Sequence, residues 1–344
     1  MIYLNCDYNE GAHPKVLERI IQTNDTQEFG YGNDNYSIQA KKLIQKTINH
    51  PDAVIHFMVS GTPTNVAFIS HVLKPYEAVI GPHTAHINVH ETGAVEARGH
   101  KVMEIMSDDG KIRPNEVEDV VKALAREPES HVVEPKIVYI TIPTEIGTMY
   151  TKKELVDMYN KCKELGLYLY VDGARLGYGL TSEGNDLDLK TIANNCDAFY
   201  IGGTKCGALC GEALILMNDY FKPHFVHSVK QAGQLLAKGR LLGAQFLALF
   251  EDNLYFDICR NANRLAIKVR NALEAKGIKF TIDSKTNQQF AILPNTFVEA
   301  LKDEFAFEYN YVVDDEHTCY RICTSWATKE ENIDRLIDRI NELL

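Results

Sequence analysis

The stretch Leu167-Tyr168-Leu169-Tyr170-Val171-Asp172-Gly173-Ala174-Arg175 indicates the fold class. Its first five residues are apolar or aromatic without alternation, which is typical of a strand buried on both faces of a parallel sheet. A carboxylate, two small residues and an arginine follow directly. Ligands of open α/β sheets bind beyond the carboxyl ends of the strands. We therefore expect Asp172 and Arg175 to lie at the functional edge of such a sheet.

The chain around this stretch alternates short apolar runs with amphipathic ones, over residues 50–220. The expected strands are Ala53–Val59, Ala78–Ile80, Lys101–Met106, Lys136–Ile142, Leu167–Val171, Ala198–Ile201 and Ala213–Leu216. The expected helices between them include Pro114–Ala125, Lys152–Leu165 and Leu187–Asn194. Strands that alternate with helices predict βαβ units, and hence a mainly parallel sheet between helices.

The last third of the chain has a different pattern. Leu241–Lys276 is expected to form one long helix that ends before Gly277. Short strands at Lys279–Ile282, Phe290–Leu293 and Tyr320–Cys323 and a final helix near Lys329–Leu344 are expected after it. We therefore predict an α/β fold with two domains. Residues 1–245 would form the large domain with an N-terminal arm, and residues 246–344 a smaller α+β domain.

The composition is that of an ordinary soluble protein. The 344 residues are 45% hydrophobic and 24% charged, and the formal net charge of −11 argues against a nucleic-acid binder. The N-terminus lacks the features of a signal peptide, and the longest apolar passage, Leu241–Phe250, is too short for a membrane helix. Eight cysteines, none spaced Cys-x-x-Cys, favour a reducing cytoplasm.

Ser60-Gly61-Thr62 follows the first expected strand and precedes a helical run. Free N–H groups, two hydroxyls and a glycine at the start of a helix form a cup for an anion such as phosphate. Pro63 suits the first helical position, and Ser60 or Thr62 suits the cap. An ordinary capped helix would explain the same residues.

Lys205 follows another expected strand, within Gly202-Gly203-Thr204-Lys205-Cys206-Gly207-Ala208. Small neighbours let a bulky group approach the backbone, and a partly desolvated lysine loses its proton more easily. These are the requirements of a Schiff-base amine, although a solvated loop lysine is the alternative. Asp172 is either the partner of a cationic heterocycle nitrogen or ion-paired with Arg175.

A phosphate cup, a buried carboxylate and an amine-bearing loop are together what pyridoxal 5'-phosphate requires. The glycine-rich nucleotide-binding motifs are absent. His83, His86 and His90 could suggest a zinc-binding hydrolase or a regulatory module, but the metalloprotease order is missing, and we expect no metal. We predict instead that His86, which follows the small Ala85, stacks on the pyridine ring.

Further motifs extend this pattern along the chain. They are Ala85-His86 with Glu91-Thr92-Gly93, Thr144-Glu145 with Gly147, Asp172-Gly173-Ala174-Arg175, Gly203-Thr204-Lys205 and Arg321. With Ser60-Gly61-Thr62, these motifs resemble the threonine aldolase and β-eliminating lyase family of fold-type I pyridoxal-phosphate enzymes. The resemblance covers nearly the whole chain and implies an aspartate aminotransferase-like fold.

The resemblance implies that Lys205 carries the cofactor and that Asp172 pairs with the pyridine nitrogen. The other residues it assigns to cofactor binding are His86, Ser60, Gly61, Thr62, Arg175 and Thr204. Arg175 and Arg321 resemble the family's clamp for the substrate carboxylate.

Six further positions follow from the same resemblance. Tyr31 matches the family's N-terminal active-site loop, and Cys6 stands where many members have a serine near the substrate carboxylate. Glu145 replaces a second active-site histidine. Lys230, Lys238 and Arg240 are candidates for phosphate contacts across a subunit interface.

The activity implied is retro-aldol cleavage of a β-hydroxy-α-amino acid, threonine or allo-threonine, to glycine and acetaldehyde. Lys205, Asp172, His86 and Glu145 are the expected catalytic residues, with His86 or a water it orders as the base and Glu145 second. The alternatives are β-elimination from a serine-type, cysteine-type or aromatic amino acid, and transamination. Enzymes of this fold generally share active sites between subunits, so a homodimer or homotetramer is expected.

Overall fold

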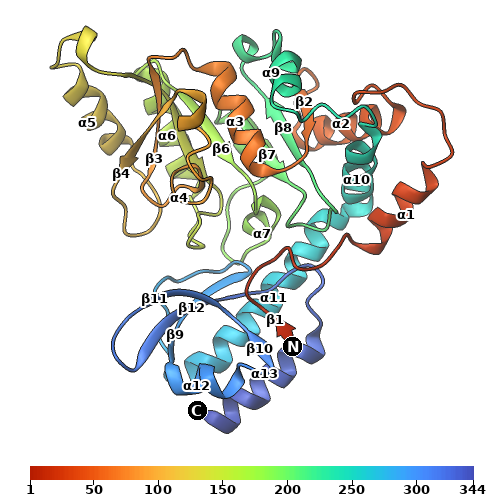
Figure 1. Ribbon diagram of the computed structural model, residues 1–344, viewed down its shortest axis with the longest axis vertical. Helices are drawn as coiled ribbons and strands as arrows, with labels where there is room; N and C mark the ends of the chain where they lie inside the picture. Colours follow the sequence, from red (N-terminus) through yellow and green to blue (C-terminus); the bar gives the residue numbers. More distant parts are fainter.

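The central layer of the computed structural model, which describes residues 1–344, is a seven-stranded sheet (Figure 1). Its strand order is β2 (Val54–Met58), β8 (Glu212–Leu216), β7 (Ala198–Gly202), β6 (Tyr168–Asp172), β5 (Glu134–Thr141), β3 (Glu77–Pro82) and β4 (Lys101–Ile105). The neighbours from β7 to β4 are parallel, and only β8 is antiparallel to the strands beside it. The predicted mainly parallel sheet is therefore confirmed.

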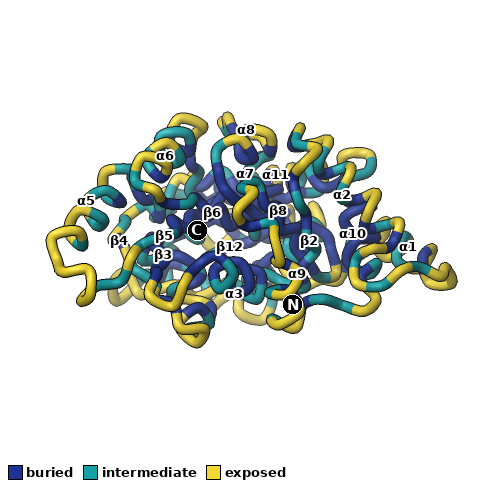
Figure 2. Tube along the Cα trace, turned by 90° about the horizontal axis from the view of Figure 1, so that it is seen from above, coloured by how far each residue is buried: buried dark blue, intermediate teal, exposed yellow.

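Helices cover both faces of this sheet (Figure 2). One face is covered by α3 (Gly61–Val72) and α9 (Phe225–Gln231). The other is covered by α2 (Asn35–Ile48), α5 (Pro114–Leu124), α6 (Lys152–Glu164), α8 (Leu189–Asn194) and α10 (Arg240–Phe250), with α1 (Pro14–Gln22) beside them. Tyr170 and Val171, adjacent in β6, belong to the cores on opposite faces, which explains why the strand sequence does not alternate.

A smaller antiparallel sheet lies in the C-terminal part, as predicted. Its strand order is β11 (Glu308–Val312), β12 (His317–Cys323) and β9 (Gln288–Pro294), and it packs with α12 (Asn295–Leu301) and α13 (Glu330–Leu343). The strand predicted at Lys279–Ile282 is wrong, because only Phe280 forms a bridge, to Ala291. The short β1 (Ile2–Tyr3) pairs with β10 (Phe305–Ala306), so the N-terminus lies against this part.

The single helix predicted over Leu241–Lys276 is also wrong. It is interrupted at Glu251–Asn253, where Asp252 and Asn253 have φ angles of 51° and 62°, and it resumes as α11 (Leu254–Ala275). Left-handed residues cannot continue a right-handed helix, so the chain changes direction there. None of the helices combines the length and apolar composition needed to cross a bilayer.

The long α11 connects the two parts of the molecule (Figure 1). Cys259 and Ala262, in its first half, pack in the large core, whereas Leu265 and Val269 pack in the C-terminal core. The hydrophobic cores therefore separate within α11. The division of the chain at residue 245 stays a prediction.

Gly173, directly after β6, has no room for a side chain. A Cβ added there would lie 1.9 Å from the carbonyl oxygen of Tyr200 in β7. We expect Gly173→Ala to lower the free energy of unfolding by about 3 kcal/mol, because the backbone must move to relieve the overlap. Denaturant unfolding measures this loss. Gly11→Ala, whose Cβ would meet nothing within 4 Å, is the control, and equal stability of the two variants would contradict the prediction.

Candidate active site

The residues predicted for the site follow strands of the central sheet at the same edge. Ser60 follows β2, His86 begins α4 (His86–Val89) after β3, and Lys205 follows β7. The helices α4 and α7 (Leu176–Leu180), which follow β3 and β6, lie at the edge of the sheet that faces the C-terminal part (Figure 1). This is the edge at which open α/β sheets bind ligands.

Asp172 ends β6 as a carboxylate that is only 1% exposed. Its Oδ2 accepts hydrogen bonds from the Tyr139 hydroxyl at 2.5 Å and from Asn65 Nδ2 at 3.1 Å. Its Oδ1 accepts from the backbone N–H of Ala174 at 3.0 Å. All these donors are neutral. The alternative ion pair between Asp172 and Arg175 is not formed, because Arg175 is paired with Asp7. Oδ1 therefore keeps a lone pair for one more donor.

Asn65 connects Asp172 to His86. Asn65 Nδ2 also donates to Glu91 Oε1 at 2.8 Å, and Asn65 Oδ1 accepts from the Tyr170 hydroxyl at 2.9 Å. The same Glu91 oxygen lies 2.8 Å from His86 Nδ1. Sequence reasoning missed Asn65 and Tyr139, since each is one polar group within an apolar helix or strand. A lone asparagine in the apolar run of α3 was the available signal.

Glu145 lies beneath the start of α4. Its Oε1 accepts from the backbone N–H of His86 at 2.9 Å and from the Thr141 hydroxyl at 2.7 Å, whereas its buried Oε2 has no partner. Burial raises the pKa of Glu145, and the charge of Asp172 acts in the same direction, although the Thr141 hydrogen bond opposes both. A carboxyl group in this environment holds a proton more readily than one in water.

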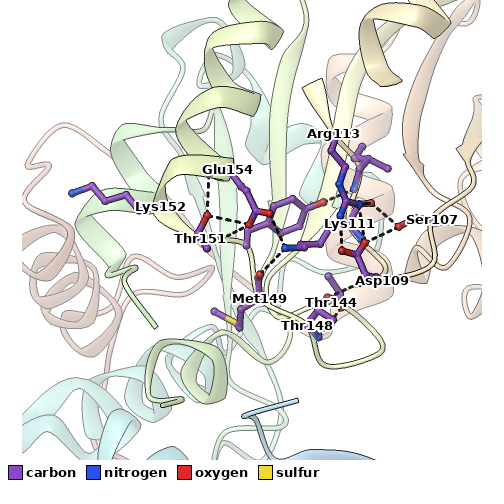
Figure 3. Close-up of polar contacts among 12 residues, drawn as sticks. Ser107, Asp109, Lys111, Arg113, Thr144, Thr148, Met149, Thr151, Lys152 and Glu154 are labelled. Atoms are coloured by element: carbon purple, nitrogen blue, oxygen red, sulfur yellow. Dashed lines mark hydrogen bonds and ion pairs between the residues drawn. The ribbon is translucent and has the colours of Figure 1, made fainter. Parts of the chain in front are cut away.

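Polar contacts fix the loop that carries Glu145 (Figure 3). The hydroxyls of Thr144 and Thr148 lie 2.7 Å apart, and Thr148 Oγ1 donates to the carbonyl of Asp109 at 2.6 Å. Asp109 forms an ion pair with Arg113 at 2.5 Å, and Lys111 Nζ donates to the Met149 carbonyl at 3.3 Å. The segment around residues 107–113 therefore holds the segment that follows Glu145.

Lys205 lies on the loop after β7 and is partly buried. Its Nζ forms no hydrogen bond or ion pair within the chain, and it lies 6.0 Å from the centre of the Tyr8 ring. Burial lowers the pKa of Lys205, and the charge of Arg175 adds to this, while Asp7, Asp172 and Glu212 oppose it. The structure therefore brings Lys205 and Asp172 within electrostatic reach of each other.

Glu212 is a residue that sequence reasoning missed. It is the first residue of β8, pairs with Gly202 of β7, and is 4% exposed. Its Oε2 accepts from the backbone N–H of Gly203 at 2.8 Å, two residues before Lys205. Burial raises the pKa of Glu212 to about 7, although hydrogen bonds from Thr204 and Gly203 and the charge of Lys205 oppose the shift. In the sequence it is one acidic residue before an apolar strand, which carries no clear signal.

The Arg175 guanidinium is paired with the carboxylate of Asp7. Arg175 Nε and Nη2 donate to the two carboxylate oxygens of Asp7 at 2.7 and 2.9 Å, and Asn287 Nδ2 donates to Asp7 at 2.9 Å. Asp7 therefore occupies two of the Arg175 guanidinium nitrogens. The predicted role of Arg175 in a clamp for the substrate carboxylate did not anticipate this contact. In Arg321, Nη2 donates to the Asn5 carbonyl at 2.8 Å, and the buried Nε has no partner.

The remaining predicted residues lie in varied surroundings. Ser60 precedes α3 but makes no side-chain cap bond, and Pro63 is the third helical residue, so the prediction of Pro63 at the first position is wrong. Thr204 Oγ1 accepts from Gly211 N at 3.0 Å. The buried Cys6 donates to Asn9 Oδ1 at 3.0 Å.

The N-terminal loop and its basic neighbours contact one another. Tyr31 is 50% exposed and lies under the amine of Lys230, 4.9 Å from its ring centre. Arg240 donates to the carbonyls of Asn24 and Thr26. His83 accepts from Ser107 N at 3.1 Å, and no group of three His, Cys, Asp or Glu side chains is arranged to hold a metal ion.

The sheet order and the motifs at its edge define an aspartate aminotransferase-like, fold-type I architecture. The structure is similar to that of an aspartate aminotransferase variant from Thermus thermophilus, with a TM-score of 0.72 at 15% identity, over 100% of this chain and 92% of that one. This likeness shows the fold alone, and it confirms the predicted fold class.

The chain belongs to the beta-eliminating lyase family, whose sequence profile matches residues 11–296. It is 30% identical over 341 residues to the low specificity L-threonine aldolase of Pseudomonas sp. (strain NCIMB 10558), covering 98% of this chain and 96% of that one. A threonine aldolase structure from Leishmania major superposes with a TM-score of 0.97 at 45% identity, over 100% of this chain and 99% of that one. The resemblance found in the sequence is thus confirmed, and the chain is a lyase by family.

Asp7→Asn would leave Arg175 buried without its counter-charge. Burial alone would raise the pKa of Asp7, but the charges of Arg175 and Lys205 outweigh it and hold the pKa below its ordinary value. The ionised pair therefore stabilises the fold above the unfolded-state pKa, and this contribution is lost as pH falls through the lower folded-state value. We expect a loss of about 3–5 kcal/mol near neutral pH that shrinks in acid, measured by denaturant unfolding. Asp303→Asn, at an exposed carboxylate, is the control, and a loss independent of pH would contradict this account.

Glu212→Gln removes a carboxyl group whose pKa is raised, whereas that of Asp7 is lowered. Because the folded chain holds this proton more tightly than the unfolded chain, wild-type stability falls as pH rises from the ordinary value of 4.5 to about 7. The variant escapes this loss, so its stability relative to wild type should be higher at about pH 8 than at about pH 5. Unfolding at both pH values tests this, with Glu183→Gln, at an exposed site, as the control. A constant difference between Glu212→Gln and wild type would refute the assignment.

Proposed function

We propose that this chain is a pyridoxal-phosphate-dependent lyase that cleaves threonine or allo-threonine to glycine and acetaldehyde. The family, the 45% identity to a threonine aldolase structure and the 30% identity to a low specificity L-threonine aldolase support this activity. The observation that carries the proposal is the pairing of an unpartnered, pKa-lowered amine at Lys205 with a buried carboxylate at Asp172 that has no cationic partner.

The residues present fit pyridoxal phosphate. Asp172 Oδ1 has a lone pair available for the protonated pyridine nitrogen, and the free Lys205 amine suits imine formation. The Ser60 hydroxyl caps nothing, so it and the first N–H groups of α3 are available for the phosphate. The cofactor, when bound, supplies an electron-accepting ring that stabilises negative charge on the substrate Cα.

The chain's own residues would orient the substrate. Arg321, whose buried Nε lacks a partner, would bind the α-carboxylate, and Arg175 would contribute the nitrogen that Asp7 leaves free. His86, whose ring orientation is fixed by Glu91, would help to hold the cofactor ring. Glu145, whose pKa is raised by burial, would hold the backbone of His86 at the start of α4.

Lys205→Ala tests the cofactor and the reaction together. We expect the purified wild type to show a visible absorbance band from the bound cofactor and to release aldehyde from L-threonine or L-allo-threonine. The variant should lose the band and at least about 10³-fold in activity, because it removes the amine proposed to form the covalent link. Lys190→Ala, at an exposed position of α8, is a matched lysine control for the absorbance band. Oxo-acid without aldehyde from L-threonine and L-serine would favour β-elimination and overturn the proposed cleavage.

We also propose that the chain forms a homodimer or homotetramer in the cytoplasm. Exposed apolar side chains around α1 and α2 support subunit contact there, with Ile21 72%, Phe29 83% and Tyr31 50% exposed. The free cysteines, of which all but Cys210 are buried, fit a reducing compartment. Light scattering of the purified protein would measure the assembly.

A further inference from the structure

His90 lies on the same side of α4 as His86. The helix is a single turn, and the backbone N–H of His90 donates to the carbonyl of His86 at 2.9 Å. Residues four apart on a helix project to one side, and the two imidazole ring centres are indeed 5.6 Å apart, with an interplanar angle of 52°. The two rings therefore stand beside each other at the site.

His86 and Glu145, the two bases suggested by the sequence, are already engaged in the structure. His86 Nδ1 is bonded to the buried Glu91, which fixes the orientation of its ring. Glu145 is half-buried, and its Oε1 accepts from the backbone N–H of His86 and the hydroxyl of Thr141. Both groups thus have structural contacts to maintain while a substrate reacts.

His90, in contrast, is exposed, and its ring makes no hydrogen bond. Burial of part of the ring is the largest cause that lowers the pKa of His90. The charges of His86, Arg321, Lys205 and Arg175 lower this pKa as well. These groups belong to α4, β12 and the segments after β7 and β6, so His90 lies within electrostatic range of residues from each of them. An imidazole in this electropositive setting is neutral near pH 7 and has a lone pair to accept a proton.

We infer that His90 is the base that removes the proton from the β-hydroxyl of the substrate, an assignment that rests on the proposed function. The O–H proton passes to a ring nitrogen of His90, and the O–H electron pair becomes the second bond of the aldehyde carbonyl. The Cα–Cβ bond breaks, and its electron pair remains on Cα. Proton uptake at Cα then yields glycine. A substrate without a β-hydroxyl would not need His90.

This last point defines the test. We compare the holoenzyme with His90→Asn and His90→Phe in two assays, aldehyde release from L-threonine and L-allo-threonine, and exchange of the Cα hydrogen of glycine in D₂O. Removal of a general base costs about 10²–10⁴-fold in rate. We expect kcat for aldehyde release to fall by about 10²-fold or more in both variants, and glycine exchange to stay within about threefold of wild type. The visible absorbance of the cofactor should not change.

Val89→Ala, at the exposed residue before His90, is the control for disturbance of α4 and should behave as wild type in both assays. Parallel loss of cleavage and exchange in the His90 variants would overturn the assignment, because it indicates a structural role. Undiminished cleavage would overturn it as well and leave His86 as the base. A wild type that exchanges glycine but releases no aldehyde would refute the proposed function itself, and this inference with it.

Discussion

The burial of the Asp172 carboxylate is the constraint on which the site depends. A carboxylate that is 1% exposed must receive hydrogen bonds, and no cationic group of the chain is hydrogen-bonded to it. Its donors are therefore the Tyr139 hydroxyl, Asn65 and the backbone of Ala174, from β5, α3 and the turn after β6. The hydrogen bonds to the one buried carboxylate of Asp172 therefore hold these three elements in position.

The network extends from Asp172 to the rest of the site. Asn65 binds Glu91, Glu91 binds His86, and the backbone of His86 binds Glu145. A shift of α3 relative to β6 would therefore break bonds at α4 and after β5. These linked hydrogen bonds fix the His86 imidazole and the Asp172 carboxylate relative to each other, as a site that holds a planar cofactor would require.

The N-terminal segment provides a second set of links, between the sheet edge and the C-terminal part. Leu4 accepts from the backbone N–H of Cys323 at 2.7 Å, and Asn5 accepts from Arg321. Asp7, two residues on, binds Arg175. The two arginines proposed to bind the substrate carboxylate are thus positioned by the same few residues, although they come from different parts of the chain. This arrangement explains why Asp7 can be buried at an otherwise cationic site.

The sequence was sufficient for features that depend on local pattern, and insufficient for contacts between distant segments. Strand ends at Asp172 and Lys205 could be recognised because an apolar run stops at a polar residue. Arg175 and Asp7 are 168 positions apart in the sequence, and no periodic pattern of residues predicts the contact between them. Glu212 was missed because its role depends on the register of β8 against β7. The break in the helix was missed because the residue types of Asp252 and Asn253 do not reveal their left-handed backbone.

Three acids at this edge have different surroundings. Asp172 receives three hydrogen bonds, all from neutral donors. Burial raises the pKa of both Glu145 and Glu212, the latter to about 7. A phosphate or carboxylate ligand would add negative charge and favour the neutral form of these two acids further. The pKa values of Glu145 and Glu212 therefore rise further as an anionic ligand binds, whereas Asp172 Oδ1 keeps a lone pair for a ring nitrogen.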